Sequence, residues 1–294
     1  MTAESRQPAV FEPTTMGELV ELRHRMPKAT IWAGGTGLMS RYYPYPYPVS
    51  REIIHLKHVA DLSRISRTER YLEIGAMATF EHVLKTGRHI LPPVLARAIA
   101  TAGPPIISSQ ATMGGNLCIP DLRLNLASGL SLFSVLVELR GGRSQSIQGR
   151  WIPFNKLYQK EGGLQIKETE ILTRIRISFD EGDFQFFQHI GFPYRYPNDS
   201  VLFAVFARHG DSSVSDYRVS ITIPRVGIFR DRDVESAVSN CSLPLTASEI
   251  RLASGQLRES LQNYSDRITP IQYARSVRAF ERSLSLLNTK VLGR

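Results

Sequence analysis

Hydrophobic and polar positions along the first 180 residues predict a mixed series of helices and strands. Thr15 followed by Glu18 is typical of a capped helix start, and the apolar positions behind this pair predict a helix to about Arg25. An Ala- and Leu-rich stretch predicts another helix over 91–102. Short apolar runs predict strands at 29–33, near 53, and at 71–74, 134–139 and 171–177, with a further helix over 79–84. The strand at 134–139 is expected to end at Gly141 and Gly142.

Beyond residue 180 the order of the elements changes. Apolar runs predict strands at 201–208, 217–223 and 225–229, followed by amphipathic helices at 246–261 and 270–287. Strands followed by helices are typical of an α+β module in which helices cover an antiparallel sheet. The polar stretch 180–183 marks a seam, so the chain is expected to divide into domains 1–180 and 181–294.

The composition is that of an ordinary globular protein. Of 294 residues, 42% are hydrophobic and 21% are charged, which is enough for two domains with cores of their own. The net charge of +9 raises the question of nucleic acid, but lysines and arginines are scattered, without a run of like charge or an aromatic platform. The charge therefore favours a solvated face or an acidic protein partner over a nucleic-acid site.

The N-terminal residues lack a basic stretch followed by an apolar core, so no signal peptide is expected. No apolar run approaches the roughly 18 residues of a membrane span. Cys118 and Cys241 are far apart and lack metal-ligand spacing, and His55 and His58 have no third ligand, so no metal site is predicted. Two free thiols are typical of a reducing compartment, which predicts a cytoplasmic protein.

Two short glycine-rich runs carry the strongest chemical signal. The first loop is Ala33-Gly34-Gly35-Thr36-Gly37-Leu38, and the second loop is Ala111-Thr112-Met113-Gly114-Gly115-Asn116-Leu117. Glycine allows positive φ and lets backbone N–H groups approach a ligand closely. Successive N–H groups in one concavity form an anion site, so two such loops predict a phosphate-bearing cofactor held from two sides. Taken singly, each loop is equally compatible with an ordinary turn after a strand.

The first loop invites comparison with the dinucleotide-binding motif G-x-G-x-x-G. It has two of the three glycines, with Ser40 at the third position. That motif needs a helix directly behind it and an acidic residue about 20 positions further on. Prolines alternate with tyrosines over 42–48, which forbids a helix there, and Lys57 and His58 stand where the acid is expected. A Rossmann site is therefore disfavoured.

Several motifs, taken in their order and spacing, resemble the FAD-binding subunit of the molybdenum hydroxylases, the family of xanthine dehydrogenase and of the medium subunit of carbon monoxide dehydrogenase. The resemblance covers nearly the whole chain. It is carried by FEPTTMGEL at 11–19, the first loop, LEIGAMATF at 72–80, the second loop, EILT at 170–173 and YARS at 273–276.

The resemblance implies an α+β fold, with a two-subdomain FAD-binding domain of the PCMH type followed by an α+β C-terminal domain. Both loops would grip the FAD diphosphate, with backbone N–H groups of residues 34–37 as one wall and those of 114–116 as the other. The hydroxyls of Thr36 and Thr112 would be available to phosphate or ribityl oxygens. An Asp-Leu pair of the family corresponds by gapless spacing to Asn125-Leu126, although Asp121-Leu122 offers the same dipeptide slightly earlier. The expected cofactor-binding residues are Ala33, Gly34, Gly35, Thr36, Gly37, Leu38, Thr112, Gly114, Gly115, Asn116 and Asn125.

The chain also departs from the family. Ser108 and Ser109 stand where many relatives have Arg-Asn, Gln188 or His189 replaces a lysine near the flavin ring, and Gly37 replaces an acidic or amide residue. These departures leave diphosphate binding in place but change the surroundings of the flavin. Two alternatives therefore stay open, a non-catalytic scaffold that has lost FAD and a stand-alone flavin oxidase.

In the family, a molybdopterin-binding large subunit oxidises the substrate, and a small subunit with [2Fe–2S] clusters relays electrons to the flavin, which passes them to NAD, a quinone or O₂. This chain has two cysteines, too few to hold such a cluster. The resemblance therefore implies one part of a split complex, with those two subunits as partners. No side chain of this chain is expected to act as a catalytic acid, base or nucleophile.

Overall fold

The computed structural model describes residues 8–39, 50–87, 89–119, 125–159, 163–192, 196–210 and 212–292. The chain forms two compact units. The N-terminal unit comprises residues up to 87 together with 103–118 and 135–178, and the C-terminal unit comprises 88–102, 119–134 and 179–294. The chain thus passes between the units more than once. The sequence predicts a single division, into domains 1–180 and 181–294, and this division stays a prediction.

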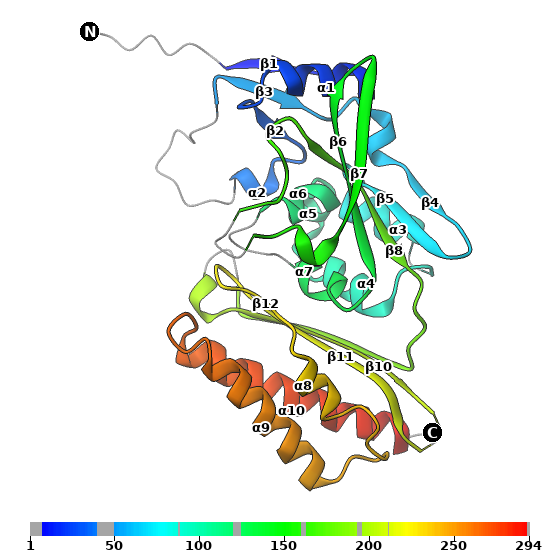
Figure 1. Cartoon of the computed structure of the whole chain (residues 1–294), viewed down its shortest axis with the longest axis vertical. Coiled ribbons are helices and arrows are strands. Elements are labelled where there is room, and N and C mark those ends of the chain that lie inside the picture. Colours follow the sequence, from blue (N-terminus) through cyan, green and yellow to red (C-terminus); the bar gives the residue numbers. More distant parts are fainter. Residues whose placement is uncertain are drawn as a thin grey trace. The chain divides into compact units, whose positions relative to one another are not determined.

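A small parallel sheet of the N-terminal unit leads into the first loop. Its strands pair in the order β1 (Ala9–Phe11), β3 (Glu52–His55) and β2 (Thr30–Trp32) (Figure 1). Helix α1 (Met16–Arg25) buries Leu19 and Val20 in one cluster with Ile54 of β3. The helix begins as predicted, because the Thr15 hydroxyl accepts the N–H of Glu18 (3.2 Å).

A larger sheet of the same unit is antiparallel. Its strands pair in the order β4 (Ile65–Arg67), β5 (Tyr71–Gly75), β8 (Ile171–Ser178), β6 (Val135–Arg143) and β7 (Ser146–Pro153). Val137 and Ile175 pair on its buried face. On the opposite face Arg174 lies 3.2 Å from a carboxylate oxygen of Glu73 and 2.8 Å from one of Glu138.

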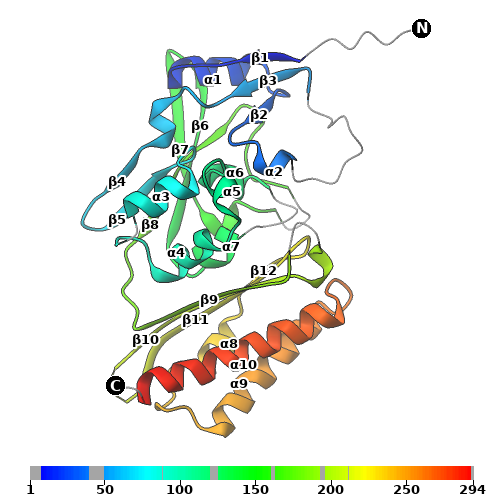
Figure 2. The same ribbon diagram turned by 180° about the vertical axis from the view of Figure 1, so that it is seen from behind.

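Short helices fill the connections of the N-terminal unit. They are α2 (Thr36–Met39), α3 (Phe80–Gly87), α5 (Pro105–Ser108) and α6 (Met113–Leu117), with single 3₁₀ turns at Ala60–Ser63 and Phe154–Lys156. Both ribbon views place α2 beside α6 (Figures 1 and 2). Segments far apart in the sequence, each containing one glycine loop, therefore lie together.

A four-stranded antiparallel sheet forms the centre of the C-terminal unit. Its order is β12 (Gly227–Phe229), β11 (Val214–Ile223), β10 (Val201–His209) and β9 (Phe184–Ile190). Helices α9 (Ala247–Gln262) and α10 (Pro270–Leu292) cover one face, while α4 (Pro93–Ala100) and α7 (Asn125–Leu130) cover the other (Figure 2). The short helix α8 (Arg232–Ser236) follows β12, and a 3₁₀ turn at Pro197–Asp199 precedes β10. Because both faces are covered, every residue of β10 from Val201 to Ala207 is buried.

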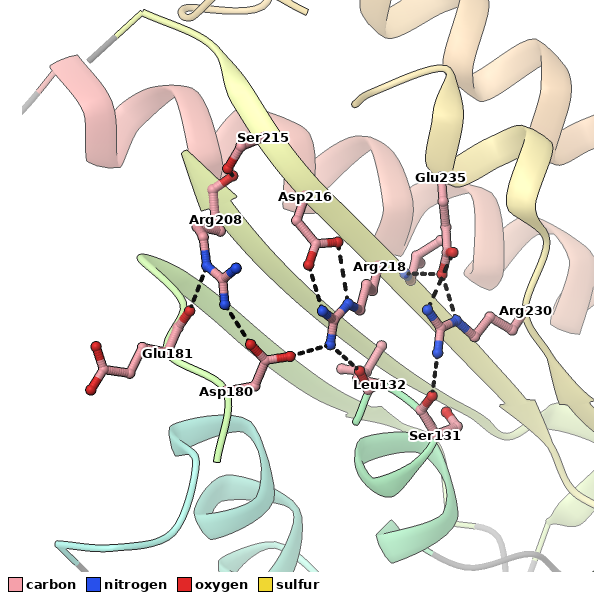
Figure 3. A network of polar contacts seen from close by, with 11 residues as sticks. Ser131, Leu132, Asp180, Glu181, Arg208, Ser215, Asp216, Arg218, Arg230 and Glu235 are labelled. Atoms are coloured by element: carbon pink, nitrogen blue, oxygen red, sulfur yellow. Dashed lines mark hydrogen bonds and ion pairs between the residues drawn. The ribbon is translucent and has the colours of Figure 1, made fainter. Parts of the chain in front are cut away.

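Arginines tie the end of α7 to this sheet (Figure 3). Arg218 of β11 donates to the carbonyl oxygen of Leu132 (2.9 Å) and to Oδ2 of Asp180 (2.6 Å). Arg230 donates to the carbonyl oxygen of Ser131 (2.6 Å). Cationic side chains thus meet the carbonyl groups just behind α7, at the end of a helix that carries partial negative charge.

The predicted α+β class is confirmed, and the predicted helices and strands are found within a few residues of their expected bounds. One expectation is wrong, because β6 does not end at Gly141 and Gly142 but continues to Arg143. Gly142 has φ of +103°, and a β-carbon built on Gly141 would lie 2.8 Å from the carbonyl oxygen of Thr169. These glycines therefore allow close approach of neighbouring backbone inside a strand rather than ending it.

Candidate functional site

The first loop runs from the end of β2 into α2. Gly35 has φ of +71°, the left-handed region that favours glycine. Thr36 begins α2, and the turn closes where the N–H of Met39 donates to the carbonyl oxygen of Gly35 (2.9 Å). The start of a helix leaves its first N–H groups without partners inside the helix. The first loop therefore turns into the start of a short helix, and its role in holding an anion stays a prediction.

The second loop is fixed against the connection between β5 and α3. The N–H of Gly114 donates to the carbonyl oxygen of Ala76 (2.8 Å), and a β-carbon built on Gly114 would lie 2.7 Å from Cβ of Ala76. Thr112 caps α6, since its hydroxyl accepts the N–H of Gly115 (3.1 Å). Glycine at 114 thus allows close packing, and the loop is held from both ends.

The two loops lie against each other within the N-terminal unit. A β-carbon built on Gly34 would overlap the carbonyl oxygen of Gln110, the residue just before the second loop. A β-carbon built on Gly115 would lie 3.8 Å from Cβ of Ala33. The predicted adjacency of the loops is therefore found, and glycine at 34 is what permits it.

The structure corrects one expectation about the second loop. Each of the three N–H groups that the sequence assigns to a ligand has a partner within the chain: Gly114 donates to Ala76, Gly115 to the Thr112 hydroxyl, and Asn116 to the Thr112 carbonyl oxygen (3.0 Å). Two of these donors bond to Thr112 in the capped turn of α6, and the third bonds to Ala76. The expectation that the second loop offers a row of free N–H groups is therefore wrong. Whether these residues contact the cofactor in another way stays a prediction.

What the second loop leaves unsatisfied is a side chain. Asn116 is only 5% exposed, and its Oδ1 has no hydrogen-bond partner among the residues that the structure describes. An unpaired buried polar group destabilises a protein by about 1–3 kcal/mol. Because this oxygen is buried, a donor from outside the chain would reach it only after a local rearrangement, so a role of Asn116 toward a ligand stays a prediction.

The other predicted residues are distributed as follows. Ala33, Thr36 and Leu38 of the first loop are half-buried, as is Gly37. Asn125 is the first residue of α7, within the C-terminal unit, and its side chain lies outside the described residues, as do the Tyr-Pro run and Asp121. The loops are therefore brought together, while the contribution of Asn125 stays a prediction.

Two polar side chains of β9 also have unpaired buried atoms. Oε1 of the Gln188 amide and Nε2 of the His189 ring have no partner in the described part of the chain. Burial lowers the pKa of His189, although a hydrogen bond with the Thr101 backbone opposes this shift. Burial therefore favours the neutral form of His189.

Metal ligation finds little support in the described ranges, where no group of three or more His, Cys, Asp or Glu side chains is placed to hold an ion. His55 Nδ1 lies 2.9 Å from Oε1 of Glu12, and His58 Nε2 lies 3.9 Å from its other oxygen. Burial raises the pKa of the Cys118 thiol to about 12, so this thiol stays protonated near neutral pH.

Comparison with known proteins identifies the family of the chain. Residues 4–178 match the family described as the FAD binding domain in molybdopterin dehydrogenase. The chain belongs to this family. FAD is the cofactor that the family binds, and the chain is accordingly a subunit or domain of an oxidoreductase of the molybdenum hydroxylase type.

Relatives of known sequence or structure agree with the family. Xanthine dehydrogenase/oxidase of Gallus gallus is 26% identical over 231 residues, which cover 71% of this chain and 16% of that protein. Carbon monoxide dehydrogenase from Hydrogenophaga pseudoflava shares the fold with a TM-score of 0.80 at 18% identity, covering 97% of this chain and 98% of the solved one. Quinoline 2-oxidoreductase from Pseudomonas putida 86 does so with a TM-score of 0.80 at 15% identity, covering 97% and 99%.

The residues present fit the FAD of this family. The close contact at Gly34 and the positive φ of Gly35 form a turn that no residue with a β-carbon would adopt without strain. The sequence did not identify Gln110 or Trp32, which both contact the first loop. The available signal was a bulky aromatic residue directly before the loop.

Among the described helices, none is long and apolar enough to cross a bilayer.

Proposed function

We propose that this chain is the FAD-carrying electron-transfer subunit of a molybdenum hydroxylase. It would take electrons from the [2Fe–2S] clusters of a partner subunit and pass them through FAD to NAD or another acceptor. The observation that best supports this function is the adjacency of two glycine loops in a unit that matches an FAD-binding family.

FAD supplies the redox chemistry when bound, and the chain binds and orients it. Backbone N–H groups of Gly34, Gly35 and Thr36 hold the diphosphate, since charge-assisted hydrogen bonds to phosphate are stronger than neutral ones. If the second loop rearranges on binding, Oδ1 of Asn116 would be able to accept a hydrogen bond from FAD. The remaining predicted residues line the cofactor: Ala33, Gly37, Leu38, Thr112, Gly114, Gly115 and Asn125.

The partners follow from what the chain lacks. Two cysteines cannot ligate an iron–sulfur cluster, which needs four protein ligands in its common forms. The match spans only 16% of the length of the xanthine dehydrogenase/oxidase that the chain resembles. We therefore expect a small [2Fe–2S] subunit and a molybdopterin-binding large subunit, assembled in the cytoplasm.

The test is a titration of the purified, cofactor-free chain with FAD, followed by flavin absorbance and fluorescence. We expect one FAD per chain and a yellow complex that survives gel filtration. NADH added without oxygen would bleach the bound flavin if NAD is the acceptor, whereas a quinone or O₂ would instead reoxidise flavin that has been reduced chemically. A folded chain that never acquires flavin absorbance would contradict the proposal.

A non-catalytic scaffold is the second candidate. It is favoured by the second loop, whose N–H groups are satisfied without any cofactor. Such a scaffold would co-purify with the two partner subunits and contain no flavin. The same titration distinguishes the two functions.

A further inference from the structure

We propose that Trp32 is the positioning residue of the first loop, because its indole holds Gly35 in the left-handed conformation from which α2 begins. Trp32 precedes the loop and is not among the predicted cofactor-binding residues. The inference rests on the proposed function, since it assigns a role to a neighbour of the same FAD site.

The backbone of Trp32 is fixed by the parallel sheet. Trp32 is the last residue of β2 and pairs with His55 of β3. Its carbonyl oxygen accepts the N–H of Leu56 (2.9 Å). The side chain therefore starts from a rigid point and is itself half-buried.

The indole lies directly against Gly35. A β-carbon built on Gly35 would lie 2.8 Å from Cζ2, 3.0 Å from Cε2 and 3.1 Å from Nε1 of Trp32. Gly34, the preceding residue, is in still closer contact with the carbonyl oxygen of Gln110, which a β-carbon built on it would overlap. The two glycines are thus held between an aromatic ring and a peptide group, with no space for a side chain at either position.

This contact matters because glycine alone does not select a conformation. Glycine reaches positive and negative φ about equally well, so its φ of +71° at residue 35 must be imposed by neighbours. Gly35 also accepts the hydrogen bond that closes α2, which means that its orientation sets the direction of the N–H groups that follow. Without the indole these donors would sample more directions, and FAD would have to order them on binding, which lowers affinity.

The experiment is FAD titration of the full chain carrying Trp32→Ala or Trp32→Phe. We expect the alanine variant to raise the Kd for FAD about tenfold, while phenylalanine, which keeps a flat ring, raises it about threefold. The control is Trp151→Ala, because the chain has two tryptophans and Trp151 packs instead against the Arg176 guanidinium, 4.1 Å from its ring centroid. This variant is expected to lower thermal stability and to leave the Kd unchanged.

A double variant separates positioning from simple support of the fold. A β-carbon at residue 35 meets the indole, so Gly35→Ala should weaken FAD binding less in the Trp32→Ala background than in the wild-type chain. Additive losses, or a Trp32→Ala variant that binds FAD as tightly as the wild type, would overturn the inference. If Trp32→Ala does not fold, the same comparison is made with Trp32→Phe. A wild-type chain that binds no FAD would instead refute the proposed function.

Discussion

The two glycine loops have similar sequences, yet the structure uses their glycines for different purposes. In the first loop, Gly34 allows contact with a neighbouring peptide group and Gly35 takes a left-handed turn into a helix. In the second loop, Gly114 allows a helix to pack on Ala76, and the N–H groups of the turn are bonded within the chain. A glycine pair in a sequence therefore indicates that another group comes close to the backbone, but not whether that group is a ligand or a neighbouring part of the chain.

The proposed function assigns ligand binding to the first loop, whereas the contacts of the second loop are those of packing. Backbone donors at a helix start interact with a diphosphate, whereas donors that are already bonded stabilise the loop itself. From the second loop only the Asn116 side chain is left with an unpaired acceptor in the described region. Variants at equivalent positions of the two loops should accordingly change different measured quantities.

The largest effect is expected for Gly34→Ala. The added β-carbon would overlap the Gln110 carbonyl oxygen, and because the obstacle is backbone, the two loops must move apart. We expect the free energy of unfolding to fall by about 3 kcal/mol and FAD binding to be lost. Chemical denaturation and FAD titration measure both quantities.

Gly17→Ala is the control for this variant. Gly17 lies in α1, where an added β-carbon would be 3.6 Å from Cβ of Ser144, an ordinary contact. Alanine is a better helix former than glycine by about 1 kcal/mol, so this variant should be as stable as the wild type or more so. A Gly34→Ala chain that binds FAD normally would show that the contact with Gln110 is not needed.

Gly114→Ala tests the packing role of the second loop. Its β-carbon would lie 2.7 Å from Cβ and 3.0 Å from the carbonyl oxygen of Ala76, so α6 must shift. We expect a loss of about 2 kcal/mol in the free energy of unfolding. At a temperature where the variant is folded, its Kd for FAD should rise less than that of Gly34→Ala. Equal losses of affinity would remove the distinction between the loops.

Asn116→Leu tests whether the unpaired amide serves the ligand. Leucine has a similar shape and removes a buried polar atom without a partner, so the cofactor-free chain should be as stable as the wild type or more stable. The Kd for FAD should rise about tenfold, the factor that corresponds to about 1.4 kcal/mol. Denaturation without FAD measures the stability of the variant, and titration with FAD measures its Kd. A destabilised variant with unchanged affinity would assign Asn116 to the fold alone.

Much of the fold follows from local patterns. The cap at Thr15, the apolar runs of β5, β8 and β10, and the amphipathic helices α9 and α10 are each specified by neighbouring residues, and the structure contains them. The division into units was harder to predict. It depends on α4 and α7 packing on a sheet that comes later in the sequence, and such non-local contacts leave no periodic signal.

The adjacency of the two loops was predictable from the sequence, but their hydrogen bonds were not. The glycine runs predict where a ligand is approached, and the loops do lie together. Whether the N–H groups of the second loop are free or bonded depends on the carbonyl oxygen of Ala76 and on the Thr112 cap. Both are positioned only by the tertiary structure. Likewise, predicting the contact of Trp32 with Gly35 requires knowing where the side chain at the end of β2 points, and the sequence does not specify this.

The smallest effects are expected for the two threonines, and they compare the loops most directly. The Thr112 hydroxyl accepts the N–H of Gly115, so Thr112→Val should lower the free energy of unfolding by about 1 kcal/mol and raise the Kd for FAD less than Thr36→Val does. Thr36 lies within α2 rather than at its cap, so Thr36→Val should leave stability within about 0.5 kcal/mol of the wild type. If its hydroxyl bonds to FAD, the Kd should rise about threefold, as expected for one lost hydrogen bond. Stability lost at Thr36 with affinity lost at Thr112 would reverse the roles assigned to the two loops.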